Sequence, residues 1–124
     1  MTDMIAKEEL PYVIAREELP HGKIAHRFEG YRYGDVNVSF FLVDSPPGKG
    51  AKLHTHPYEE VFITLEGEAT FTVGDATIVA SAGQIVVAPA GVPHKFVNSG
   101  TRTLRQVDIH PSRRIEQTDI PENE

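Results

Sequence analysis

The sequence has no cysteine among its 124 residues. This absence excludes disulfides and any chemistry that uses a thiolate. It also has no apolar run of the roughly 20 residues that a transmembrane helix needs. Near the N-terminus, Glu-Glu pairs stand where a secretory signal would have an apolar centre. We therefore predict a cytoplasmic protein without membrane contacts.

Positive charge is also scarce. Twelve Lys and Arg residues face 18 Asp and Glu residues, which gives a formal net charge of −6. Sequence-independent binding of nucleic acid needs a basic surface. Several arginines lie between 102 and 114, but Glu116 and Asp119 follow them, and this mixture is more typical of a solvated face than of a phosphate site. No nucleic-acid partner is expected.

The length fits one domain with a genuine core, and a composition of 40% hydrophobic and 24% charged residues is typical of globular proteins. Residues 1–22 repeat a Glu-Glu-Leu-Pro unit and are broken by prolines. We expect these residues to form an N-terminal arm that packs on its own barrel or on that of a partner, and residues 23–124 to form the single domain.

The domain is predicted to be all-β. Apolar, β-rich stretches alternate with turn residues, and short strands at this spacing indicate a sandwich or barrel. Apart from a possible turn near 115–119, no stretch has convincing helical periodicity. The predicted strands cover residues 24–28, 36–43, 60–66, 69–73, 76–80, 84–88, 94–97 and 103–110.

Three histidines and one glutamate carry the chemistry. His54 and His56 are two residues apart, so both side chains leave one face of a strand, and Glu60 lies at a further even offset. His94 comes from a different strand. A single histidine or glutamate would more often be a surface residue or a satisfied core residue, but together the four make a nitrogen and oxygen ligand set for a divalent first-row metal.

The residues around these four closely resemble the paired motifs of the cupin superfamily. The first motif has a glycine at each end and is matched by Gly48, His54, His56, Glu60 and Gly67. The second motif is matched by Gly83, Pro89, Gly91, His94 and Asn98. The resemblance covers about residues 35–110 and implies a small double-stranded β-helix, or jelly-roll, barrel. It also implies one metal bound inside the barrel by His54, His56, Glu60 and His94.

Four protein ligands leave one or two open positions on a five- or six-coordinate metal. Fe, Mn, Ni, Co and Zn all suit the ligand set, and the sequence does not choose among them. Because neutral imidazole is the ligand, metal binding should weaken on acidification.

Strand alternation predicts part of the cavity lining. Phe62 and Thr64 should point inward with Glu60, and Phe96 with His94. We favour a mostly apolar cavity. Asn98 is expected to cap a turn rather than bind metal.

The last strand leaves two alternatives. One face carries Gln106, Asp108 and His110, and the other carries Val107 and Ile109. If Gln106 faces the metal, it could orient a substrate. His110 precedes a proline, and we expect a turn residue there more than a residue near the metal.

The resemblance implies a metal-dependent enzyme of the dioxygenase or oxidoreductase type that acts on a small organic substrate, with Glu60 as a possible base as well as a ligand. Cupin isomerases and decarboxylases are alternatives, and so is a non-catalytic module that binds metal or a small ligand. We also expect a homodimer, since the arm carries a strand-like segment that its own barrel does not obviously pair.

Overall fold

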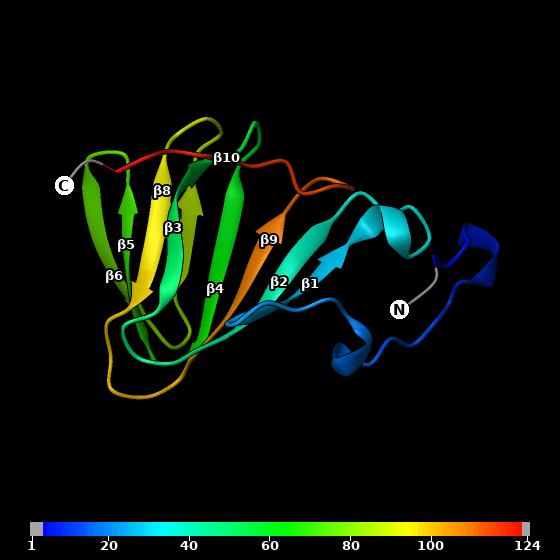
Figure 1. Cartoon of the computed structure of the whole chain (residues 1–124), viewed down its shortest axis with the longest axis horizontal. Coiled ribbons are helices and arrows are strands. Elements are labelled where there is room, and N and C mark those ends of the chain that lie inside the picture. Colours follow the sequence, from blue (N-terminus) through cyan, green and yellow to red (C-terminus); the bar gives the residue numbers. More distant parts are fainter. Residues whose placement is uncertain (1–3, 123–124) are drawn as a thin grey trace.

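The computed structural model describes residues 4–122. They form two five-stranded antiparallel sheets, with strand orders β1-β2-β9-β4-β7 and β10-β3-β8-β5-β6. The strands are β1 (Ala25–Glu29), β2 (Ser39–Ser45), β3 (Gly50–Thr55), β4 (Glu60–Glu66), β5 (Glu68–Val73), β6 (Ala76–Ser81), β7 (Ile85–Ala88), β8 (His94–Asn98), β9 (Leu104–His110) and β10 (Thr118–Asp119). The short 3-10 turns are η1 (Lys7–Glu9), η2 (Arg16–Glu18) and η3 (Gly30–Arg32). Figure 1 shows the strands side by side along the long axis of the molecule.

The predicted all-β jelly roll is confirmed, and most strand positions agree within a residue or two. The second strand differs, because it begins at Ser39 rather than Val36 and continues to Ser45. Val36 instead closes a loop, since its N–H donates to the carbonyl of Gly30 at 3.1 Å. Near the C-terminus, Thr118 and Asp119 form the short strand β10, which pairs with β3 next to His54. This edge pairing brings the C-terminal segment to the strand that carries the predicted ligands.

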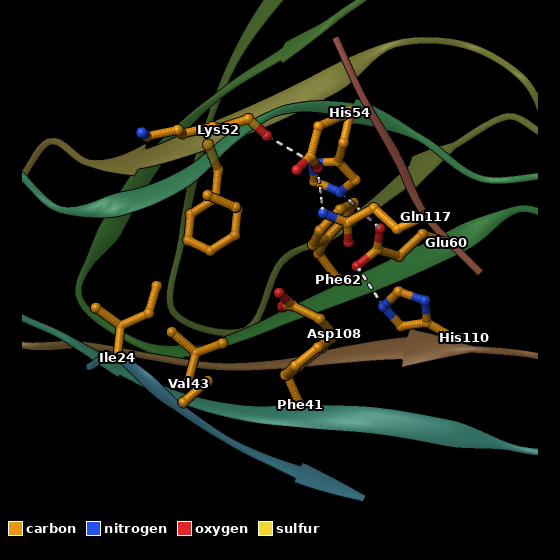
Figure 2. A pocket seen from close by; sticks show the side chains of 14 residues that line it. Ile24, Phe41, Val43, Lys52, His54, Glu60, Phe62, Asp108, His110 and Gln117 are labelled. Carbon is orange, nitrogen blue, oxygen red and sulfur yellow. Dashed lines mark hydrogen bonds and ion pairs between the residues drawn. The ribbon is translucent and has the colours of Figure 1, made fainter. Parts of the chain in front are cut away.

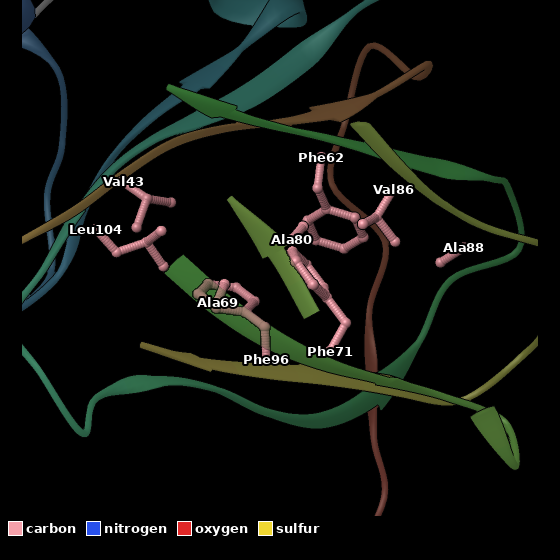
Figure 3. Close-up of a cluster of buried hydrophobic side chains, with 9 residues drawn as sticks. All are labelled: Val43, Phe62, Ala69, Phe71, Ala80, Val86, Ala88, Phe96 and Leu104. Carbon is pink, nitrogen blue, oxygen red and sulfur yellow. The ribbon is translucent and has the colours of Figure 1, made fainter. Parts of the chain in front are cut away.

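The apolar core lies between the two sheets (Figure 3). Buried residues alternate with less buried ones along β4, β5 and β9, as expected for strands with one face inward. Phe62, Phe71 and Phe96 pack their rings against one another with centroids 4.9–6.1 Å apart. The buried cluster in Figure 3 consists of Val43, Phe62, Ala69, Phe71, Ala80, Val86, Ala88, Phe96 and Leu104.

The described part of the arm contacts the outside of the same chain. The N–H of Ile5 donates to the carbonyl of Arg32 at 2.7 Å, and Ile5 is buried with Leu19 and Tyr33 in a second apolar cluster. Leu42, on the outer face of β2, packs against this cluster. In Figure 1 the arm, in dark blue, lies beyond the β1 end of the sheet, far from β5 and β6. No helix among the described residues is long and apolar enough to cross a membrane.

Candidate metal centre

The four predicted ligands meet inside the barrel. His54 lies on β3, His56 just beyond its end, Glu60 at the start of β4 and His94 at the start of β8. All four are buried, and their ligand atoms lie within 4.8 Å of one another. Glu60 Oε1 lies 2.8 Å from His94 Nε2, 3.0 Å from His56 Nε2 and 3.9 Å from His54 Nε2. The three histidines and the carboxylate therefore converge through these atoms, and we call this group the cage.

Backbone carbonyls orient each of the three imidazoles. The Nδ1 atoms of His54, His56 and His94 lie 2.5, 2.7 and 3.0 Å from the carbonyl oxygens of Lys52, Glu116 and Val92. A ring that donates its Nδ1 hydrogen to a carbonyl has, when neutral, a bare lone pair on Nε2. All three lone pairs therefore face the same point, which is the arrangement that metal-binding histidines show.

The ligand atoms of the cage converge on a point that suits a bound cation. With neutral rings, the Nε2 atoms and the carboxylate oxygen present lone pairs to one another at close range. Without a metal, the 2.8 Å contact of His94 with Glu60 Oε1 would need a hydrogen on Nε2. His56 Nε2 is buried and has no hydrogen bond among the described residues, because its contact with Glu60 lacks the angle of one. The orphaned nitrogen and the shared focus are what a metal would satisfy.

His110 contacts Glu60 on the side away from the three cage histidines. Its Nε2 lies 3.1 Å from Glu60 Oε2, while its Nδ1 lies 2.7 Å from the hydroxyl of Tyr58. That hydroxyl accepts the N–H of Glu116 at 3.1 Å, and Nδ1 of His110 is its one acceptor among the described residues. Burial raises the pKa of Tyr58 to about 12, so the phenol keeps its hydrogen and donates it to Nδ1. The ring hydrogen of His110 is then on Nε2, facing Glu60.

This assignment makes His110 a support for Glu60 rather than a fifth ligand. Its Nε2–H is off the ideal hydrogen-bond direction to Oε2, but the 3.1 Å contact keeps that oxygen occupied while Oε1 faces the three histidines. Burial by itself would raise the pKa of Glu60. The contact with His110, and those with the three cage histidines where a ring carries a hydrogen on Nε2, outweigh burial and lower this pKa, so the carboxylate stays ionised.

One cavity of about 320 Å³ opens onto the cage. The surface of its lining is mostly apolar, as expected, although polar residues also contribute to it. The apolar lining residues are Ile24, Ala25, Phe41, Val43, Ala51, Phe62 and Phe96. The polar lining residues are Lys52, His54, Glu60, Asp108, His110, Gln117 and Asp119. Figure 2 shows how the cage occupies one side of this space and the aliphatic side chains the other.

Two of the four predicted pocket residues line the cavity. Phe62 and Phe96 line the cavity. Thr64 and Gln106 are buried inside the barrel but do not line it. Asn98 is also buried, and it hydrogen-bonds to backbone groups: its Nδ2 donates to the carbonyls of Ser45 and Arg102, and its Oδ1 accepts the N–H of Gly100. The predicted turn-capping role of Asn98 agrees with these bonds.

Two residues of β9 lie closer to the candidate metal centre than the sequence predicted. His110 is not a turn residue, since it ends β9 with its side chain buried beside Glu60. Asp108 also points inward and lines the cavity. The signal was present in the alternation, because Gln106, Asp108 and His110 share one face, but alternation does not say which face is inside.

The comparisons with known proteins agree with this geometry. The cupin domain family matches residues 41–110. Among solved structures, an oxalate decarboxylase mutant of Bacillus subtilis aligns with a TM-score of 0.78 at 21% identity, covering 90% of this chain and 33% of that one. Another structure of that decarboxylase, from a study of its Mn(II) centres, aligns with a TM-score of 0.75 at 21% identity, covering 84% and 30%. At this identity these matches describe the fold.

Curated relatives match only in part of their length. Mannose-1-phosphate guanylyltransferase 2 of Escherichia coli O157:H7 is 28% identical over 92% of this chain and 23% of its own. Acireductone dioxygenase of Leishmania braziliensis is 33% identical over 45% of this chain and 18% of its own. The chain thus spans less than a quarter of either protein. The family match, the jelly-roll barrel and the cage of three histidines and one glutamate together show that this chain belongs to the cupins.

Proposed function

We propose that this cupin is a mononuclear-metal enzyme of the dioxygenase or oxidoreductase type that acts on a small organic substrate. The observation that carries the proposal is the position of the cage in the wall of the cavity. His54 and Glu60 line that cavity, so a metal held by the four residues would present an open side to any molecule inside it. A cavity near the lower end of the usual range for ligand sites suits a small molecule.

His54, His56, Glu60 and His94 would hold the metal, and carbonyl-bound Nδ1 atoms would keep the three rings in place. A divalent first-row metal there would supply Lewis-acid activation of a substrate oxygen, and a redox-active one would add dioxygen chemistry. The aromatic and aliphatic lining would exclude water from the apolar part of the substrate. The similarity to part of an acireductone dioxygenase supports the oxidoreductase class.

The base role predicted for Glu60 has less support from the geometry. Oε1 of Glu60 faces three histidines and Oε2 faces His110, so neither oxygen is free for a substrate proton. Glu60 therefore contributes chiefly as the anionic ligand in this proposal.

The test is metal analysis of the purified protein, followed by dioxygen uptake with catechols, flavonols, 1,3-diketones and thiols. We expect about one metal per chain, and uptake with at least one substrate class. The His94→Ala variant should lose both. His21→Ala, which removes an exposed histidine outside the cage, should keep both.

Stoichiometric metal with no uptake and no product from any class would favour the non-catalytic binding module instead. If the protein contains no metal after growth and purification with each of the five candidate metals, the proposed metal-dependent function is wrong. A cytoplasmic location remains a prediction, which cell fractionation would check.

A further inference from the structure

Asp108 is a buried carboxyl group that the metal cage does not use. It lies on β9 between two aromatic residues, since its pairing partners are Phe41 on β2 and Phe62 on β4. Only 4% of its surface is exposed, and it lines the same cavity as His54 and Glu60. Figure 2 shows its carboxyl turned into the space between Val43 and the cage.

This carboxyl group has one hydrogen bond and no cationic partner among the described residues. Gln106 Nε2 donates to its Oδ1 at 2.7 Å, and no donor within residues 4–122 reaches Oδ2. An ionised carboxylate without a counter-charge is unfavourable in such surroundings, and an apolar residue of similar size would fill the space without this penalty. The group is therefore poorly explained as a stabilising element of the barrel.

Its surroundings favour the protonated form. Burial, and after it the negative charge of Glu60, raise the pKa of Asp108 well above its usual range, and the hydrogen bond from Gln106 opposes them only in part. A neutral carboxyl group is a hydrogen-bond donor as well as an acceptor. The side of the cavity opposite the aliphatic residues thus offers a metal cage and, beside it, a proton source.

We propose that Asp108 is the proton donor of the cavity, acting on a small organic oxyanion such as a 2-oxo acid or its enolate. This inference rests on the proposed metal-enzyme function and narrows its substrate class. The charged oxygens would lie at the cage and the apolar body against Ile24 and Val43. Asp108 would then face the atoms between these two ends.

The proton step balances within the site. The O–H bond of Asp108 breaks, and its proton moves to a carbon of the bound enolate, whose electron pair forms the new C–H bond. Asp108 is left as a carboxylate, and the substrate loses the negative charge of the enolate. In the reverse direction the carboxylate removes a proton from the same carbon, so exchange of that proton with solvent reports the step.

The test uses Asp108→Asn, which keeps size and donor capacity but cannot transfer a proton, and Asp108→Leu, which removes both. Asp75→Asn, in the exposed turn between β5 and β6, is the control. The probe is pyruvate with the Mn(II)-loaded protein in D2O, and its methyl deuteration is followed by NMR. We expect wild type and the control to accelerate exchange, and Asp108→Asn to lose at least a hundredfold of it, the lower range for general acid–base catalysis. Asp108→Leu should also weaken pyruvate binding.

Two measurements without turnover separate this inference from the proposed function. Infrared spectra of the metal-free protein should contain the C=O band of a protonated carboxyl group, which Asp108→Asn removes. Metal content of Asp108→Asn should equal that of wild type. Stoichiometric metal with no such band, or a band with exchange unchanged by Asp108→Asn, would overturn the role of Asp108 and leave the metal enzyme intact. A protein that takes up no metal would instead remove the proposed function, and the pyruvate site with it.

Discussion

At the scale of single residues, the cage and its supports differ in what their removal should do. His56 and His94 each bring one Nε2 to the cage, at similar distances from Glu60 Oε1. Replacing either with alanine removes one ligand from a set of four, so we expect both variants to lose metal to a similar degree. Metal content after dialysis, measured by elemental analysis, checks this.

Asn98→Ala is the matched comparison, because Asn98 belongs to the same motif but binds three backbone groups instead of the cage. Leaving buried backbone groups without partners should lower the free energy of unfolding by about 1–3 kcal/mol. Metal content should stay near that of wild type. Metal loss equal to that of His94→Ala would show that Asn98 has a different role.

His110 should tune the metal without being needed to hold it. It occupies Oε2 of Glu60 and is itself held by Tyr58. Partners that orient metal ligands are worth about 10–100-fold in metal affinity, so His110→Ala should weaken metal binding by roughly that factor and Tyr58→Phe by less. Competition with a chelator measures the affinity, and the EPR spectrum of bound Mn(II) should change in both variants. Loss as complete as in His94→Ala would make His110 a ligand.

Because the pKa of Asp108 is raised by folding, we predict that the stability of the protein depends on pH. In an unfolded chain an Asp has a pKa of about 3.9. Above about pH 4 the unfolded chain therefore releases this proton while the folded chain retains it, and stability falls as pH rises toward the folded-state pKa. Asp108→Asn abolishes this contribution, so its free energy of unfolding relative to wild type should increase with pH, by at most about 1.4 kcal/mol per pH unit. Urea titrations of the metal-free proteins from pH 4 to 8 measure the difference, and a constant difference would contradict the prediction.

At the scale of elements, two turns between strands depend on a glycine with positive φ. Gly67, between β4 and β5, has φ of 90°, and a Cβ there would lie 2.8 Å from the carbonyl oxygen of Thr103. Gly83 has φ of 86° but open space around a Cβ. Gly67→Ala should thus combine strain with a backbone clash, whereas Gly83→Ala has the strain alone, about 1–3 kcal/mol. Chemical unfolding should rank Gly67→Ala as the less stable of the two, and the reverse order would contradict the argument.

The strands also show what could be predicted from the sequence. His54, His56, Glu60 and His94 were predictable because their spacing within two short motifs is local. The inward face of β9 was not predictable. One face carries Val107 and Ile109, and the other carries Gln106, Asp108 and His110. Because apolar residues are usually the buried ones, the pattern favours the wrong face. In the structure the polar face lies inside, where His110 contacts Glu60. The Glu116 backbone contacts with His56 and Tyr58 were equally unpredictable, since they join residues about 60 positions apart.

At the scale of the whole molecule, several large apolar side chains of the described residues remain exposed. On β7, an edge strand of its sheet, Ile85 and Val87 are 62% and 56% exposed, and on the arm Val13 is 91% exposed. Neighbouring exposed apolar side chains on an unpaired edge are typical of an interface. Ile5 and Leu19 of the arm are buried in their own chain, which leaves the middle of the arm for a partner.

We therefore predict a twofold homodimer in which the middle of each arm covers apolar surface of the other barrel, since closed twofold pairs are the commonest soluble assembly. Light scattering at micromolar concentration should give about twice 13.7 kDa. Deleting residues 1–20, or replacing Val13 and Ile85 with lysine, should shift the mass toward one chain. The lysine variant separates loss of the interface from loss of the arm's own packing, because both side chains are exposed within the chain. A wild-type mass of one chain, unchanged by the deletion, would refute both the dimer and the role of the arm.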